Sequence, residues 1–313
     1  MMIKNSVIRV FCIAIALLCA MTFMLSGCSS KRNNSKDESI EDETENILGD
    51  DGNTTLDDEY TTKEDTTDTN TGIAPPAVEG TDILHVGFGE NKDYVVVIDA
   101  GHQRHGMSEK EPNGPGSDTM KAMVTSGTQG AFTGVYEYEL TLRVAMALRD
   151  ELISRGYTVV MVRETHDVKV SNIGRAEIAN KYAPSEENGY KGAVNIRIHA
   201  NGFDNPSANG ALMCAPTSEN PYKIGELYEE CLSLANAIID PYCEATGIKK
   251  RSSYIQYGDN MTGTNWCEIP TTILEMGFMT NEADDNLMQS EGFDKNAALG
   301  IADGIESFFE IYR

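Results

Sequence analysis

The stretch VVVIDAGHQ, residues 95–103, begins with four apolar residues and ends in an acid, two small residues and a histidine. The apolar part predicts a buried strand. Two later stretches are built in the same way: NIRIHAN, residues 195–201, places His199 just after an apolar run, and TTILEMGFMTN, residues 271–281, ends its apolar run at Glu275. Three strands that each present a polar group at their C-terminal end indicate one shared site.

Helical patterns separate these strands. Residues 138–157 carry apolar side chains four apart along one face, and similar stripes run through residues 223–246 and through the segment after Asp294. Ser171 is placed to cap a further helix over residues 172–182. Alternating strands and helices predict an α/β fold. Ligands of open α/β sheets gather outside the carboxyl ends of the strands, where the polar groups are expected here.

The polar groups at these strand ends suit a metal. Catalytic zinc takes three protein ligands from His, Glu, Asp or Cys and keeps a fourth position for water. His102 and His199 are candidates for two ligands, and either Glu137 or Glu139, in the first turn of a predicted helix, is a candidate for the third. Spacing alone does not decide, because a histidine on a strand is also an ordinary packed residue.

The composition excludes one class of partner. The chain has 313 residues, of which 40% are hydrophobic, so it can form a sizeable core. Its formal net charge is -24. A polyanion of this size repels nucleic acid, so we expect no DNA or RNA partner.

The N-terminus has the features of an export signal. Lys4 and Arg9 precede an apolar run over residues 10–25, which is short for a membrane span. The run ends in LSGC, which resembles the lipobox of bacterial lipoproteins. That resemblance implies a signal peptide over residues 1–27, cleavage before Cys28 and lipid attachment to Cys28. An uncleaved signal anchor is the alternative.

An acidic, polar segment follows the expected lipid site. Residues 28–83 are rich in Asp, Glu, Thr, Asn and Ser and hold few large apolar groups, so they cannot bury enough surface to fold. We interpret them as a disordered tether, with a mean reach of about 40 Å for roughly 50 flexible residues. A single folded domain is then expected over residues 84–313.

Besides Cys28, four cysteines remain in the exported part: Cys214, Cys231, Cys243 and Cys267. No two of them form a CxxC pair, which argues against a cysteine metal site. They could form two disulfides in any of three pairings, or remain free in the core.

Four motifs in order, IDAGHQ, EYELTL, IRIHANG and ILEMGFMTN, closely resemble the zinc-dependent N-acetylmuramoyl-L-alanine amidases of amidase family 3. The resemblance runs from about residue 93 to 312. The stretches EPNGPGS and GTNWCEIP resemble a clostridial-type lipoprotein branch with an elongated first loop. The resemblance implies a twisted mixed sheet of about six strands with helices on both faces. It also implies hydrolysis of the amide between N-acetylmuramic acid and L-alanine in peptidoglycan.

Matching the motifs residue by residue implies the roles of the site. The zinc ligands of the family fall on His102, Glu137 and His199, which would hold one Zn²⁺ ion. The catalytic glutamate falls on Glu275. It would take a proton from water and pass it to the leaving nitrogen.

Three further residues have expected roles. Arg197 replaces the usual small residue of the family; it would either pair with a carboxylate of the stem peptide or pack beside the sheet. Asn201 would orient substrate. Asp99 would either hydrogen-bond a ligand histidine or cap the end of its strand.

The resemblance leaves alternatives to the amidase. One is a lipoprotein that binds peptidoglycan fragments on an amidase-like fold without catalysis, and another is a zinc peptidase of the cell wall. The stretch from Glu137 to His199 has the pattern helix, strand, helix, loop, without an extra helix that would block the zinc, which predicts an open site. We expect a monomer anchored to the outer face of the cell membrane, acting in the cell wall.

Overall fold

The computed structural model describes residues 80–88 and 92–311. The expected signal peptide, the lipid site Cys28 and nearly all of the expected tether lie outside this range. Within it, no helix is long and apolar enough to cross a membrane.

A twisted mixed sheet of seven strands forms the centre of the described domain, in the order β1-β5-β2-β6-β9-β7-β8. The strands are β1 (Thr81–His85), β2 (Tyr94–Ala100), β5 (Thr158–Arg163), β6 (Gly192–Asn201), β7 (Ala211–Ala215), β8 (Lys250–Tyr257) and β9 (Thr271–Phe278). Strands β5, β2, β6 and β9 run parallel, so their carboxyl ends share one edge. Strand β1 is antiparallel to β5, and β7 is antiparallel to β9.

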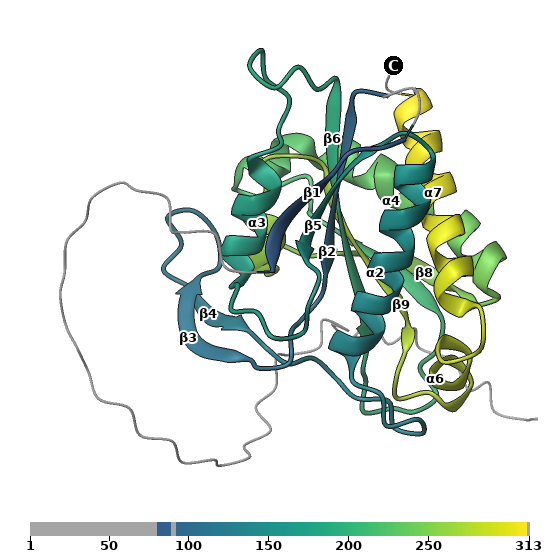
Figure 1. Cartoon of the computed structure of the whole chain (residues 1–313). Coiled ribbons are helices and arrows are strands. Elements are labelled where there is room, and N and C mark those ends of the chain that lie inside the picture. The colour runs from purple at the N-terminus through teal and green to yellow at the C-terminus, as the bar shows by residue number, and fades with distance from the viewer. Residues whose placement is uncertain (1–79, 89–91, 312–313) are drawn as a thin grey trace, which may run out of the picture. The chain divides into compact units, whose positions relative to one another are not determined.

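Helices cover both faces of the sheet, as expected for the α/β class (Figure 1). They are α2 (Glu137–Ser154), α3 (Asn172–Asn180), η1 (Lys223–Leu227), α4 (Tyr228–Thr246), α5 (Thr262–Asn265), α6 (Glu282–Met288) and α7 (Phe293–Ile311). Helices α2, α4 and α7 pack on one face and α3 on the other. Ser171 caps α3, as expected, because its side chain accepts a hydrogen bond from the Gly174 amide.

The period of two in β2 explains how the sheet separates its two cores. Val96 and Ile98 point into the large core under α2, α4 and α7, whereas Val95 and Val97 point into the smaller core under α3. All seven residues of β2 are buried. A strand buried on both faces is therefore apolar along its whole length until Asp99.

The described domain has more strands than the sequence predicted. The sheet has seven strands rather than about six, and the folded part begins at Thr81, slightly before residue 84. A separate hairpin of β3 (Met107–Pro112) and β4 (Met120–Val124) occupies the elongated loop after His102 (Figure 1). The four cysteines of the described domain are free, and three of them are buried.

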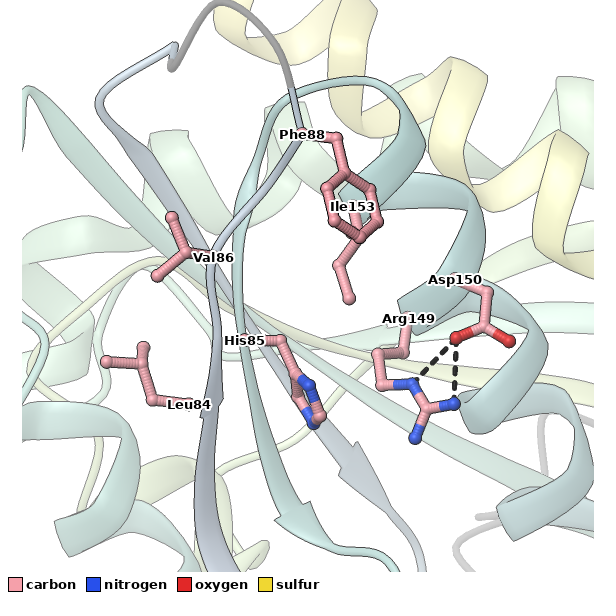
Figure 2. Close-up of a pocket in the computed structure, with 7 residues that line it drawn as sticks. All are labelled: Leu84, His85, Val86, Phe88, Arg149, Asp150 and Ile153. Atoms are coloured by element: carbon pink, nitrogen blue, oxygen red, sulfur yellow. Dashed lines mark hydrogen bonds and ion pairs between the residues drawn. The ribbon is translucent and has the colours of Figure 1, made fainter.

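An open hollow of about 520 Å³ lies between β1 and the C-terminal part of α2 (Figure 2). Its lining includes Phe88, Ile153 and Arg149. The charged groups there are already paired: Arg149 binds Asp150 and Glu164, and His85 also binds Glu164. The hollow is at the end of α2 opposite Glu137, so it does not contain the residues expected to form the site.

Candidate functional site

The carboxyl edge of the parallel strands brings His102, Glu137 and His199 together. His102 follows β2, His199 lies near the end of β6, and Glu137 is the first residue of α2. These three residues form the group of possible metal ligands found among the described residues. The sequence had proposed the same three.

The three candidate donor atoms form a nearly equilateral triangle. His102 Nε2 lies 3.1 Å from His199 Nδ1, and Glu137 Oε1 lies 3.2 Å from each of these nitrogens. Zinc with ligands at 2.0–2.1 Å in a tetrahedron separates its donor atoms by about 3.3 Å. Two histidines and one carboxylate are also a ligand set of catalytic zinc. The residues present therefore fit a zinc ion.

Hydrogen bonds orient the ligands. His102 Nδ1 lies 3.0 Å from the Thr125 carbonyl oxygen, which can only accept, so the proton is on Nδ1 and Nε2 is left with a free lone pair. Glu137 Oε2 accepts from the Thr128 amide at 2.9 Å, and Oε1 accepts from the Ala200 amide at 3.0 Å. Both carboxylate oxygens are thus fixed before any ion binds.

Glu275 lies directly opposite His199 on the neighbouring strand β9. Its Oε2 atom and His199 Nε2 are buried without a hydrogen-bond partner among the described residues. Buried polar atoms without partners are uncommon and mark places where water, an ion or a ligand belongs. Burial and the nearby Glu137 carboxylate raise the pKa of Glu275 to about 8.

The charges of the ligands depend on one another. Burial opposes the charge of His102, yet the Glu137 carboxylate outweighs it and raises the pKa of His102. Burial lowers the pKa of His199 to about 4. Burial also opposes the charge of Glu137, but the two histidines hold the pKa of that carboxyl well below its usual range. Glu137 is therefore ionised, as a metal ligand must be.

Buried arginines hold the turn that carries His102. His102 has φ = 59°, a left-handed conformation that is unusual for a residue with a side chain. Arg175, from α3, donates to the carbonyl oxygens of Ala100 and His102 at 2.9 and 2.8 Å. Arg163, at the end of β5, donates to the carbonyl oxygens of Ala100 and Gly101 at 2.9 and 3.0 Å.

Asp99 supplies the negative charge that pairs with two buried arginines, Arg175 and Arg197. It is fully buried and accepts from Arg175 and from Arg197 Nε, so it supports the site through arginines. Burial opposes its charge, but the two guanidinium groups lower the pKa of Asp99 well below its usual range. No bond from Asp99 to a ligand histidine is seen in the described part of the chain.

Arg197 and Asn201 have positions that bear on their expected substrate roles. Arg197 is buried and binds Asp99 and the Asn172 side chain, so two of its donors are used inside the protein. The backbone carbonyl of Asn201 accepts from the Met279 amide at 2.8 Å, and Asn201 is 9% exposed. Contact of either side chain with substrate stays a prediction.

Several residues of the site were not found from the sequence. Arg163 lies in a strand pattern and Arg175 in a helix pattern, and neither pattern indicated a role in the site. Thr125 and Thr128 lie in a polar stretch without a motif. One signal was available: Arg163 ends the otherwise apolar strand TVVMVR, and a charged group at that place needs buried partners.

A family model described as N-acetylmuramoyl-L-alanine amidase, Amidase_3, matches residues 96–307, which is more than half of the chain. The protein belongs to this amidase family. The "Probable cell wall amidase LytH" of Staphylococcus epidermidis is 22% identical over 173 residues, which cover 55% of this chain and 50% of that protein. The chain thus matches about half the length of this relative.

Solved amidase structures share the fold. The N-acetylmuramyl-L-alanine amidase Ami1 from Mycobacterium smegmatis has a TM-score of 0.60 and 22% identity, with 70% of this chain and 97% of that chain covered. The apo Ami1 from Mycobacterium abscessus has a TM-score of 0.58 and 24% identity, with 69% and 98% covered. This structural similarity shows the fold alone, because the sequence identities are below 25%. The description of the site in this amidase family member depends on the positions of its own residues.

Asp99→Asn tests the buried network. The change leaves two buried guanidinium groups without their carboxylate, so we expect the free energy of unfolding at pH 7 to fall by about 3–5 kcal/mol. The lowered pKa means that the contribution of Asp99 is present above about pH 4 and is lost as the pH falls further. Urea unfolding should therefore show a difference between variant and wild type that narrows at low pH. Asp150→Asn, at an exposed pair with Arg149, should change stability by less than about 1 kcal/mol.

Gly101→Ala tests the packing of the ligands. A Cβ atom at Gly101 would lie 2.5–2.6 Å from three atoms of the His199 ring, so the ring must move. We expect zinc affinity, measured by competition with a chelator, to fall about tenfold or more. Gly174→Ala is the control, because its added Cβ atom would meet a Val170 methyl group at 3.2 Å and the Ser171 hydroxyl oxygen at 3.6 Å, and no atom of the candidate ligands within 4 Å. Unchanged zinc affinity in Gly101→Ala would contradict the assignment of His199.

Proposed function

We propose that this protein is a zinc-dependent hydrolase that cleaves the amide between N-acetylmuramic acid and L-alanine in peptidoglycan. The observation that supports it most directly is the triangle of His102, Glu137 and His199 with Glu275 beside it. Membership of the amidase family supports the same reaction.

His102, Glu137 and His199 would hold the zinc ion. When bound, zinc supplies a Lewis acid that polarises the amide carbonyl and lowers the pKa of water. The three ligands carry a single negative charge, from Glu137, so a bound zinc ion keeps a net positive charge.

Glu275 would move the proton. Its carboxylate accepts a proton from the attacking water as the water oxygen bonds to the carbonyl carbon. It then donates this proton to the alanine nitrogen as the carbon–nitrogen bond breaks. The raised pKa of Glu275 suits both roles, because a carboxyl group that titrates near neutral pH both accepts and donates.

The competing function is binding of peptidoglycan fragments without catalysis. It needs the fold but neither Glu275 nor a metal. The geometry favours the enzyme, because Glu275 lies directly opposite the candidate ligand His199 and its buried Oε2 atom has no hydrogen-bond partner among the described residues. Such an atom is where a reacting water or substrate group would bind.

The proposed reaction is tested with purified peptidoglycan and release of free L-alanine amines. We expect release that stops with a chelator, returns with zinc, and falls about a hundredfold or more in Glu275→Ala because the proton carrier is lost. Glu268→Ala, at an exposed glutamate, is the matched control and should keep full activity. Opened peptide crosslinks with intact alanine amides would show a peptidase instead. Zinc binding without any release would favour the binding function.

We further propose that the protein is exported and held at the outer face of the cell membrane by lipid on Cys28, with the chain between Cys28 and β1 as a tether. The lipobox-like LSGC supports the anchor, and the name of the staphylococcal relative supports action at the cell wall. The enzyme would act as a monomer, and a dimer in sedimentation velocity would contradict that.

Cys28→Ser tests the anchor. The variant has no sulfur to which lipid can be attached. We therefore expect its distribution between cell fractions to differ from that of the wild type, with protein either released into the medium or present with its signal peptide uncleaved. Immunoblots of cell fractions measure this, and incorporation of a labelled fatty acid measures lipidation directly. A variant that is still labelled would exclude Cys28 as the lipid site.

A further inference from the structure

Two exposed aromatic side chains lie in the loop that directly precedes the candidate ligand Glu137. Phe132 and Tyr136 are 53% and 45% exposed, and both lie on the loop that leads into α2. Both are large apolar groups presented to solvent within a few residues of the candidate site. Exposed apolar groups that gather beside a candidate site are candidates for a ligand-binding surface.

Hydrogen bonds to a buried carboxylate hold this loop in place. Asp285, a fully buried residue of α6, accepts from the amides of Phe132 and Thr133 at 3.0 and 2.9 Å and from the Thr133 hydroxyl at 2.8 Å. The Ala131 amide also donates to the Met279 carbonyl at 2.9 Å. A buried carboxylate that binds three groups of one surface loop keeps the tip of the loop, and so Phe132, in one place.

The loop also closes on the ligand. The Glu137 amide donates to the Thr128 carbonyl oxygen, and the Thr128 amide donates to Glu137 Oε2, both at 2.9 Å. Tyr136 directly precedes Glu137, and its ring stacks on the buried Tyr138 ring at 5.4 Å. The position of Tyr136 is thereby tied to the position of Glu137.

We propose that Phe132 and Tyr136, the aromatic rim, bind sugar rings of a glycan strand beside the scissile amide. This inference rests on the proposed function for its substrate class. The C–H groups on the face of a sugar ring pack on an aromatic face, and rigid aromatic groups lose little conformational entropy when they bind. The rim therefore positions the strand, while the ligands and Glu275 act on the amide.

The test measures binding of peptide-free glycan strands to the zinc-loaded full-length protein, which needs no turnover. We expect Phe132→Ala and Tyr136→Ala each to weaken binding about three- to tenfold, and Tyr136→Phe, which keeps the ring, to bind like wild type. Phe88→Ala is the matched control, because Phe88 is 76% exposed at the opposite end of α2 (Figure 2). Zinc content should be equal in all variants.

Kinetics on whole peptidoglycan give the second readout. The rim variants should raise KM by a similar factor and leave kcat unchanged. Equal glycan binding in wild type and both alanine variants would overturn the inference, as would binding of stem peptides but not of glycan strands. A wild-type protein that binds glycan through the aromatic rim but is inactive would refute the proposed amidase reaction and support the glycan-binding role of the rim. A wild-type protein that is active but binds no glycan would refute only the glycan-binding role of the rim.

Discussion

The ion pairs of Asp99 with Arg175 and Arg197 are the interaction on which the placement of the site depends. Arg175 reaches from α3 across the end of β2 and binds both Asp99 and the backbone that follows it. A buried guanidinium group needs a counter-charge and hydrogen-bond acceptors. The turn supplies the Asp99 carboxylate and two carbonyl oxygens to the two terminal nitrogens of Arg175. The same bonds hold His102 in its left-handed conformation, so the electrostatics of the core determine the direction of a ligand.

The two carboxyl groups of the site are distinguished by their surroundings. Glu137 lies between two histidines and two backbone amides, which stabilise its anion. Glu275 is buried near the Glu137 carboxylate, and burial and this neighbouring charge both raise its pKa. Its Oε2 atom has no partner in the described chain. In the proposed reaction, two acids whose pKa values are driven apart in this way would divide the work of ligand and proton carrier. The division follows from position alone, since both are glutamates.

The sequence predicted the centre of the fold better than its periphery. The parallel strands are apolar along their length and end in polar groups, so their pattern identified them together with His102, His199 and Glu275. The hairpin of β3 and β4 was missed because MSEKEP is a mostly exposed strand with neither alternation nor β-branched residues. Asp285 resembled an ordinary acid in the first turn of α6. Its bonds to a loop far away in sequence depend on tertiary structure, which no local pattern encodes.

The antiparallel course of β1 has a consequence for how the domain is held. Because β1 runs against β5, Thr81 pairs with Arg163 at the carboxyl end of β5, and Gly80 accepts a hydrogen bond from Glu164 there. The chain therefore enters the domain at the edge that carries the candidate metal ligands. If the domain is fixed through its N-terminus, the candidate site lies at the end of the domain where the chain enters. The reach of this site from the anchor is then set by the length of the preceding chain, and the thickness of the domain does not extend it.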